Sequence, residues 1–300
     1  MGINQLNKII AEAGSNHNGD KDKAKKLVNI AKRAGASSIK FQFIFPEGLY
    51  LPKTWIDGQL VSSNVYEVRC REQLTKSEWK EVWQYSKSSG IDVSASVFCA
   101  QGIKLLGELG ADYVKIASTD LTNLTLVDLA CQKFQNVIIS TGMATIDEIA
   151  KTVNMVCVRY PKVNLSLMHC VSVYPCAFEN AQLSRIISLR NAFNLQVGYS
   201  DHTDDATSAI LAWGMGVRLF EKHFTYDKKA SGFDHKHAQD LKSLGKYIDI
   251  LGRCDKAIKW DSYQMDSGQL ETRIRARRGV YAAKDLPAGH ILLAKDLLHV

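Results

Sequence analysis

Residues 195–202 read LQVGYSDH, an apolar run that ends in a serine, an aspartate and a histidine. The same change from apolar to polar occurs in SSIKFQF at residues 37–43, in YVKIAS at 113–118 and in LFEKHFT at 219–225. Strands that stay apolar until their last residues and then become cationic or imidazole-bearing are typical of the C-terminal rim of a parallel β/α barrel, where active sites are built. These stretches therefore predict a barrel enzyme whose rim suits an anion and a metal.

Apolar runs of strand length alternate with helical patterns along the chain. Eight runs predict strands, at residues 8–13, 38–43, 92–98, 113–117, 137–141, 164–169, 195–200 and 218–224. The clear helical patterns span residues 20–34, 75–88, 101–109, 124–134, 145–158, 182–192, 205–214 and 238–254. Helix ends are expected at glycines that can adopt the left-handed conformation, namely Gly35, Gly90, Gly110 and Gly216.

This strict alternation implies parallel pairing of the strands. Eight strand–helix units favour closure into an α/β fold of the (β/α)8 TIM-barrel type over an open sheet. No Gly-x-Gly-x-x-Gly follows the first predicted strand, which removes the main argument for a Rossmann fold.

The pattern divides the chain into three parts. Residues 1–260 are expected to form the barrel, 261–278 a polar linker, and 279–300 a strand, a turn at 287–289, a second strand and the start of a helix. Within the barrel, residues 44–74 form a long connection that follows the second strand on the catalytic side. Connections of this length are usually functional or disordered, so we expect a partial lid.

The composition argues against several classes of protein. With 300 residues and 46% hydrophobic content, the chain can bury the core of a barrel of roughly 250 residues. The net charge of +7 suits solubility or an anionic substrate better than nucleic acid, because the lysines are spread along helices and are not interleaved with aromatic residues. The seven scattered cysteines include no Cys-x-x-Cys pair, and no apolar run approaches about 18 residues, so we expect a reducing, cytoplasmic location without membrane insertion.

Two lysines near predicted strand ends, Lys40 and Lys115, indicate an anion site. With Ser96, Ser118 and Ser200 they could hold a phosphate and a carboxylate together, because ammonium groups neutralise charge and hydroxyl groups donate directed hydrogen bonds. A single barrel lysine could equally reach the surface or pair with a carboxylate. Two lysines facing hydroxyl groups favour the anion site.

His202 and His223 end the last two predicted strands, which are neighbours in a barrel. Their imidazoles could share one divalent ion whose other positions are filled by water or substrate oxygens. Such a donor set suits Mn²⁺, with Mg²⁺, Co²⁺ or Zn²⁺ as alternatives. The structural alternative is one hydrogen-bonded histidine in each strand.

Carboxylates and further histidines fall near the same rim. Four carboxylates are candidates, and each alone could also be a structural hydrogen-bond acceptor: Glu12, Asp120, Glu221 and Asp234. Three histidines fall in predicted loops, where solvent exposure is expected: His17, His235 and His237.

The order of short motifs along the chain resembles that of the sialic acid synthase family, which comprises N-acetylneuraminate synthase and its relatives. The motifs are AEAGSNHNGD (11–20), IKFQ (39–42), VKIAS (114–118), STGM (140–143), HCVSVYP (169–175), GYSDHT (198–203), EKHFT (221–225) and GFDHKHA (232–238). They cover nearly the whole predicted barrel. The resemblance implies a metal-dependent transferase that condenses phosphoenolpyruvate (PEP) with an open-chain N-acyl amino-hexose such as N-acetylmannosamine. The products would be a nine-carbon 2-keto acid and phosphate.

The resemblance also implies roles for individual residues. PEP would be bound by Lys40, Ser96, Lys115, Ser118, Thr141, Ser172 and Ser200. The metal ligands would be His202 and His223, with Mn²⁺ favoured and Mg²⁺ or Co²⁺ as alternatives. The sugar would be bound by Gln42, Tyr174 and Asp234, and the catalytic groups would be Glu12, Asp120, Glu221 and His223.

The chain departs from the family pattern at several positions, among them residues 95–98, Asp120, Ser172 and Phe233, and at its C-terminal segment. Phe233 stands where the family often has proline, which leaves the identity of the amino sugar open between N-acetylmannosamine and a deoxygenated bacterial sugar. Residues 279–300 resemble the opening of the family's C-terminal antifreeze-like (SAF) domain, as an incomplete copy, and family members form homodimers through that domain. Two alternative functions stay open: another PEP–aldose synthase of the 3-deoxy-octulosonate type, and a catalytically silent binding protein derived from the family.

Overall fold

The computed structural model describes residues 8–258 and 264–300, which fall into two compact units divided between Lys256 and Ala257. The larger unit is a closed barrel in the strand order β1-β10-β9-β8-β7-β6-β5-β2, in which neighbouring strands pair in parallel. The eight strands are β1 (Lys8–Gly14), β2 (Ser38–Phe43), β5 (Asp92–Val97), β6 (Val114–Ile116), β7 (Asn136–Ser140), β8 (Asn164–His169), β9 (Gln196–Asp201) and β10 (Leu219–His223). The predicted TIM barrel is confirmed.

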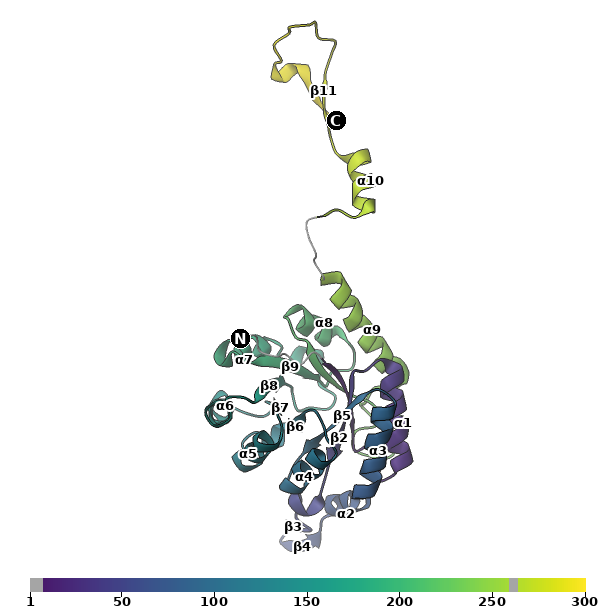
Figure 1. Ribbon diagram of the computed structural model, residues 1–300, viewed down its shortest axis with the longest axis vertical. Coiled ribbons are helices and arrows are strands. Elements are labelled where there is room, and N and C mark those ends of the chain that lie inside the picture. Colours follow the sequence, from purple (N-terminus) through teal and green to yellow (C-terminus); the bar gives the residue numbers. More distant parts are fainter. Residues whose placement is uncertain (1–7, 259–263) are drawn as a thin grey trace. The chain divides into compact units, whose positions relative to one another are not determined.

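Helices surround this barrel, as Figure 1 shows. They are α1 (Lys21–Ala34), α3 (Lys76–Ser88), α4 (Ala100–Glu108), α5 (Leu124–Lys133), α6 (Ile146–Arg159), α7 (Ser184–Phe193), α8 (Thr207–Gly214) and α9 (Leu241–Ile258). Each predicted helical pattern coincides with one of them. The four glycines expected at helix ends all have positive φ, between 68° and 89°, where residues with a Cβ are disfavoured.

Side-chain capping explains where several helices begin. The Asp20 carboxylate accepts hydrogen bonds from the backbone N–H groups of Asp22 and Lys23 at the start of α1. At the start of α6, Thr145 and Glu148 form a reciprocal capping box. Such caps satisfy amide groups that have no partner within the helix, and each typically stabilises it by about 1 kcal/mol.

The period of two along each strand sorts the barrel interior into layers. Ile10, Tyr113 and Leu219 belong to one buried apolar cluster inside the barrel. Two residues further along β6 and β10, on the same faces, lie Lys115 and Glu221. The barrel is therefore closed by apolar side chains below and carries charged groups directly above them.

The long connection between β2 and α3 contains secondary structure of its own. It holds a 3₁₀ turn (Pro46–Gly48), an antiparallel hairpin of β3 (Lys53–Ile56) and β4 (Gln59–Ser62), and helix α2 (Asn64–Arg71). The hairpin is largely exposed, with Trp55 70% accessible, whereas Arg69 of α2 is buried. The segment predicted as a partial lid is thus a hairpin followed by a helix with one buried arginine.

The second unit is small. Within the stretch assigned to a linker, Ser267–Ala276 form helix α10. Strands β11 (Val280–Ala282) and β12 (Leu297–His299) pair antiparallel. Strand β12 follows a 3₁₀ turn at Ala294–Asp296 and occupies the residues where the start of a helix was expected. Asp296, fully buried, accepts bonds from His290 and the Leu293 amide and fixes this turn. Within the described part of the chain, no helix is long and apolar enough to cross a membrane.

Candidate active site

A cavity of about 340 Å³ opens among the C-terminal ends of the barrel strands. Most of the residues predicted for the site line it: Glu12, Lys40, Gln42, Ser96, Lys115, Ser118, Ser172, Tyr174, Ser200, His202, Glu221 and His223. They meet here because the carboxyl ends of parallel strands lie at one end of a barrel, however far apart they are in the sequence.

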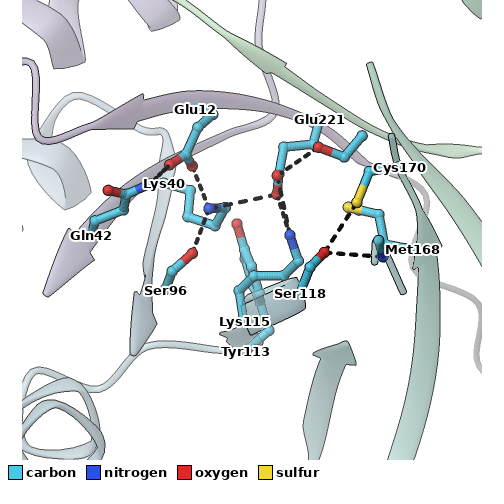
Figure 2. A network of polar contacts seen from close by, with 12 residues as sticks. Glu12, Lys40, Gln42, Ser96, Tyr113, Lys115, Ser118, Met168, Cys170 and Glu221 are labelled. Carbon is cyan, nitrogen blue, oxygen red and sulfur yellow. Dashed lines mark hydrogen bonds and ion pairs between the residues drawn. The ribbon is translucent and has the colours of Figure 1, made fainter. Parts of the chain in front are cut away.

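Two buried lysines converge on one carboxylate at the bottom of this cavity (Figure 2). Lys115 Nζ lies 3.1 and 3.0 Å from the two carboxylate oxygens of Glu221. Lys40 Nζ lies 3.6 Å from Glu221 Oε2 and also forms an ion pair with Glu12. These four charged groups come from four different strands. Each lysine ammonium group lies beside at least one carboxylate, so the opposite charges offset one another.

Neutral polar groups complete this network. Lys40 donates to Ser96 Oγ at 2.7 Å, and the Ser200 hydroxyl donates to Glu221 Oε1 at 3.0 Å. The Gln42 amide donates to Glu12 Oε1 at 3.2 Å. Both carboxylates and the Lys40 ammonium group therefore have several fixed partners, as buried charges require.

The two carboxylates differ in their electrostatic surroundings. Burial raises the pKa of Glu12 to about 7, outweighing the attraction of Lys40, and the Glu221 charge adds to the rise. Burial also opposes charge on Glu221, but Lys115 and Lys40 together hold the pKa of that carboxyl below its usual range. Glu221 is therefore the permanent counter-charge, and Glu12 is the group that can gain or lose a proton near neutral pH.

A second set of hydroxyl groups, those of Ser118 and Ser172, lies after the ends of β6 and β8. Ser118 Oγ accepts a hydrogen bond from the Gly142 amide at 3.0 Å and lies 3.2 Å from Cys170 Sγ. A Cβ at position 142 would lie 2.8 Å from both of these atoms and would also clash with the Ser172 hydroxyl. Glycine at this position thus leaves the Ser118 and Ser172 hydroxyl groups free to face the cavity.

His202 and His223 lie side by side at the mouth, with ring centroids 5.7 Å apart. His202 Nδ1 lies 2.6 Å from the Val171 carbonyl oxygen. Because a carbonyl can only accept, Nδ1 carries the proton and Nε2 keeps a lone pair. His223 Nδ1 is buried and has no hydrogen-bond partner among the described residues. Burial lowers the pKa of both imidazoles, that of His202 to about 3 with a further effect of His223.

These two neutral imidazoles fit the donor set expected of a divalent-metal site. Within residues 8–258 and 264–300, no three His, Cys, Asp or Glu side chains are arranged to hold a metal ion. Two imidazoles would therefore need oxygen ligands from water or substrate to complete a coordination shell. The Tyr174 ring, 4.1 Å from the His202 ring and 5.6 Å from the His223 ring, packs against both of them.

Three predicted residues lie outside the lining of the cavity. The Asp120 carboxylate accepts bonds from its neighbours Thr119 and Asn123. The Thr141 hydroxyl donates to the Met168 carbonyl. Asp234 lies at the rim instead, with its oxygens 3.7 Å from His223 Nδ1 and 3.7 Å from His237 Nε2.

The expectation that the three loop histidines are exposed is wrong. His17 and His235 are buried, with 2% and 0% accessibility, and His237 is half-buried against the Tyr174 ring. His235 Nδ1 lies 2.6 Å from Thr225 Oγ1. Local sequence gave no signal for this burial, because it arises when the loops fold back onto the barrel mouth.

Cys170 and Arg69 were not singled out by sequence reasoning. Cys170 follows the end of β8 directly, and the strand-end rule that found the other residues would have found it. Arg69 lies in the inserted helix α2, far from any strand end, and no such signal exists for it.

The chain is an eight-stranded (β/α)8 barrel with two lysines, several hydroxyl groups and two imidazoles around a cavity at the C-terminal ends of its strands. This arrangement is typical of TIM-barrel enzymes. The chain belongs to the NeuB family, whose model matches residues 27–261.

Similar proteins carry consistent names. The chain is 34% identical to the N,N'-diacetyllegionaminic acid synthase of Campylobacter jejuni, over 96% of this chain and 88% of that protein. It is 30% identical to a pseudaminic acid synthase of the same species, over 97% and 86%. Among solved structures, the N-acetylneuraminic acid synthetase of Leptospira borgpetersenii in complex with citrate matches with a TM-score of 0.77 and 30% identity, covering 92% of this chain and 94% of that one. These names support an enzyme of the NeuB family that acts as a sialic acid-type synthase.

Proposed function

We propose that this chain condenses phosphoenolpyruvate with an open-chain N-acyl amino-hexose, N-acetylmannosamine or a related bacterial amino sugar, to give a nine-carbon 2-keto acid and phosphate. The observation that carries the proposal is the convergence of Lys40 and Lys115 in one cavity with His202 and His223. The names of the related synthases agree with this class of product.

The lysine side of the cavity suits PEP. This substrate carries a phosphate and a carboxylate on a small carbon frame, and the two ammonium groups can offset charge on both. Hydroxyl groups from three strand ends, Ser96, Ser118 and Ser200, line the same space. PEP would displace the ion pair of Lys40 with Glu12, which can take up a proton, while Glu221 would stay beside both lysines as their permanent counter-charge.

The other side of the cavity suits the sugar. Gln42 and Tyr174 line the cavity, and Asp234 lies at its rim, which supplies an amide, a phenol and a carboxylate for the hydroxyl and acylamino groups of an amino sugar. Burial raises the pKa of the Tyr174 phenol, so Tyr174 stays protonated and can donate a hydrogen bond.

A divalent ion, with Mn²⁺ favoured, would be held by His202 and His223. When bound, it would supply Lewis acidity toward the aldehyde oxygen of the sugar. The neutral state of both imidazoles follows from their burial, and the proton on His202 Nδ1 is fixed by the Val171 carbonyl.

The bonds change in three stages. PEP carbon-3 bonds to the aldehyde carbon, whose oxygen takes a proton, and the electron pair of the enol double bond is consumed. Because burial raises the pKa of Glu12 to about 7, this carboxyl is partly protonated at neutral pH, which supports a role for it as the donor of that proton. Water then adds to the electron-poor carbon-2 and loses a proton. The tetrahedral carbon expels phosphate, which leaves with the electrons of its C–O bond, while the new hydroxyl group loses its proton and forms the 2-keto carbonyl. Lys40 and Lys115 stabilise the negative charge on the departing phosphate, a contribution of about 3 kcal/mol for a well-placed donor.

The experiment is to supply PEP, Mn²⁺ and a panel of N-acylated hexosamines, to measure phosphate release and to identify the product by mass spectrometry. A product with the mass of a nonulosonic acid is expected with a free N-acyl sugar. Turnover only with a phosphorylated sugar that lacks an acylamino group would favour a synthase of the 3-deoxy-octulosonate type. Measurable PEP binding without phosphate release for any sugar would favour a catalytically silent binding protein.

A further inference from the structure

The loop that carries Asp234 is held to neighbouring segments by several contacts, three of which lie around Asp234. At one side, Asn18 Nδ2 donates to the Ser231 carbonyl at 2.8 Å. At the other side, the buried His235 ring contacts the Thr225 hydroxyl at 2.6 Å. Between them, the Arg69 guanidinium lies over the Phe233 ring, with Cζ 4.1 Å from the ring centroid. Only the third contact comes from the inserted segment between β2 and α3.

Asp234 follows Phe233 directly and is directed toward the sugar side of the cavity. A Cβ added to Gly14 would lie 2.7 Å from Asp234 Oδ2, 3.6 Å from Glu12 Oε1 and 3.7 Å from Gln42 Cδ. These three polar side chains therefore surround one point on β1. The Asp234 carboxylate lies 3.7 Å from His223 Nδ1 and 3.7 Å from His237 Nε2, which is too far for a hydrogen bond. These contacts therefore hold it only weakly, and a small shift of the loop would move Asp234 away from Glu12 and Gln42.

Arg69 is held rigidly before it meets the loop. Its Nη1 donates to Ser15 Oγ at 2.6 Å and to Glu72 Oε2 at 2.8 Å. The side chain is only 9% accessible, so the guanidinium plane has one orientation. An arginine fixed in this way presents a flat cationic face, and a ring stacked on it is held by electrostatic and dispersion attraction.

We propose that Arg69 and Phe233 form a clamp through which the inserted helix α2 positions Asp234 over the sugar side of the cavity. The clamp rests on the proposed function, because it assigns Arg69 and Phe233 as positioning residues for the amino sugar and not for PEP. Neither residue lines the cavity, so each acts through Asp234.

The test compares Arg69→Met, which keeps the apolar stem and removes the guanidinium, with Phe233→Leu and with the double variant. We expect KM for the sugar to rise roughly three- to thirtyfold in each single variant, the range that corresponds to loss of a partly desolvated cation–π contact. KM for PEP should stay within about twofold of the native value. KM for the sugar in the double variant should not exceed the higher of the two single-variant values, since both substitutions remove the same contact.

Arg218→Met is the matched control. Arg218 is stacked on Trp213 with Cζ 3.8 Å from the ring centroid, but it precedes β10 at the end of the barrel opposite to His223. Its loss removes an arginine–aromatic stack of the same kind without touching the loop. KM for both substrates should stay unchanged in this variant.

Hydrogen–deuterium exchange provides a measurement that does not depend on turnover. Peptides spanning residues 229–240 should exchange faster in Arg69→Met and Phe233→Leu than in native protein or in Arg218→Met. Arg69→Lys keeps the charge and loses the planar face, so its loop peptides should exchange at a rate between those of native protein and Arg69→Met. This variant shows whether a folding defect accounts for the result.

Unchanged loop exchange, or equal rises in KM for sugar and PEP, would overturn the clamp. If the native protein turns over no sugar of the panel, the proposed function fails, while loop exchange still decides whether Arg69 and Phe233 hold the loop.

Discussion

Replacing Glu221 by Gln tests whether the buried lysines depend on this one carboxylate. The change keeps the size of the side chain and removes its charge, which leaves Lys115 without the two oxygens at 3.0 and 3.1 Å. Lys40 also loses its second carboxylate, 3.6 Å away. Removing one partner of a buried ion pair costs about 3–5 kcal/mol, so we expect the free energy of unfolding to fall by about that amount.

Urea unfolding followed by tryptophan fluorescence measures this loss, because Trp79 and Trp83 of α3 are buried against β2. In thermal unfolding the same loss corresponds to a Tm lower by roughly 6 to 20 °C. Glu81→Gln is the control, since Glu81 pairs with Lys21 and Lys25 at the exposed surface and should cost no more than about 1 kcal/mol.

Inorganic phosphate makes the test more specific. In Glu221→Gln the lysines lack their counter-charge, so an added anion should stabilise this variant more than the native protein. The thermal shift at rising phosphate concentration measures the difference. If Glu221→Gln loses no more stability than Glu81→Gln and gains nothing extra from phosphate, then the lysines are not held by Glu221 and the account of the cavity is wrong.

Three further predictions concern single residues of the cavity. Lys115→Met removes one of the two ammonium groups, and kcat/KM for PEP, measured by phosphate release, should fall about 100-fold or more; a fall below threefold would place PEP elsewhere. The pKa of Glu12 is raised from 4.5 to about 7, mainly by burial, so the folded chain holds this proton more tightly than the unfolded chain and the free energy of unfolding should fall as pH rises between these values. Glu12→Gln cannot titrate and should flatten this part of a urea-unfolding pH series, whereas an unchanged slope would assign the proton to another group. Chelation should abolish phosphate release and Mn²⁺ restore it, and His223→Ala should weaken Mn²⁺ binding in calorimetry; full rate and affinity in that variant would remove His223 from the site.

The strands and the membership of the cavity could be predicted from sequence because both follow from local rules. An apolar run that leads to Ser118 or to His202 marks a strand and its C-terminal end at once. Parallel closure then brings these ends together without further information. The order of neighbours also follows, and β9 and β10 do lie next to each other with their histidines adjacent.

What could not be predicted depends on tertiary packing. The loop from Phe233 to His237 has the polar composition of an exposed segment, yet His235 is buried because the loop folds back against Thr225. Arg69 lies in a helix inserted between β2 and α3, and nothing in its own sequence shows that it contacts Ser15 and Phe233. The division of protons between Glu12 and Glu221 likewise depends on distances to two lysines that only the folded barrel fixes.

The layer beneath the charges explains why this cavity can exchange one anion for another. Ile10, Tyr113 and Leu219 close the barrel below Lys115 and Glu221, so water cannot screen the lysines from that side. Two ammonium groups in such a place require negative charge at all times, because an unpaired buried cation is strongly unfavourable. Glu221 supplies that charge permanently, and Glu12, whose pKa lies near 7, can take up a proton when a substrate anion arrives. A cavity with only the two lysines would be unstable when empty, and one with two permanent carboxylates would repel the substrate; one fixed and one titratable carboxylate avoid both outcomes.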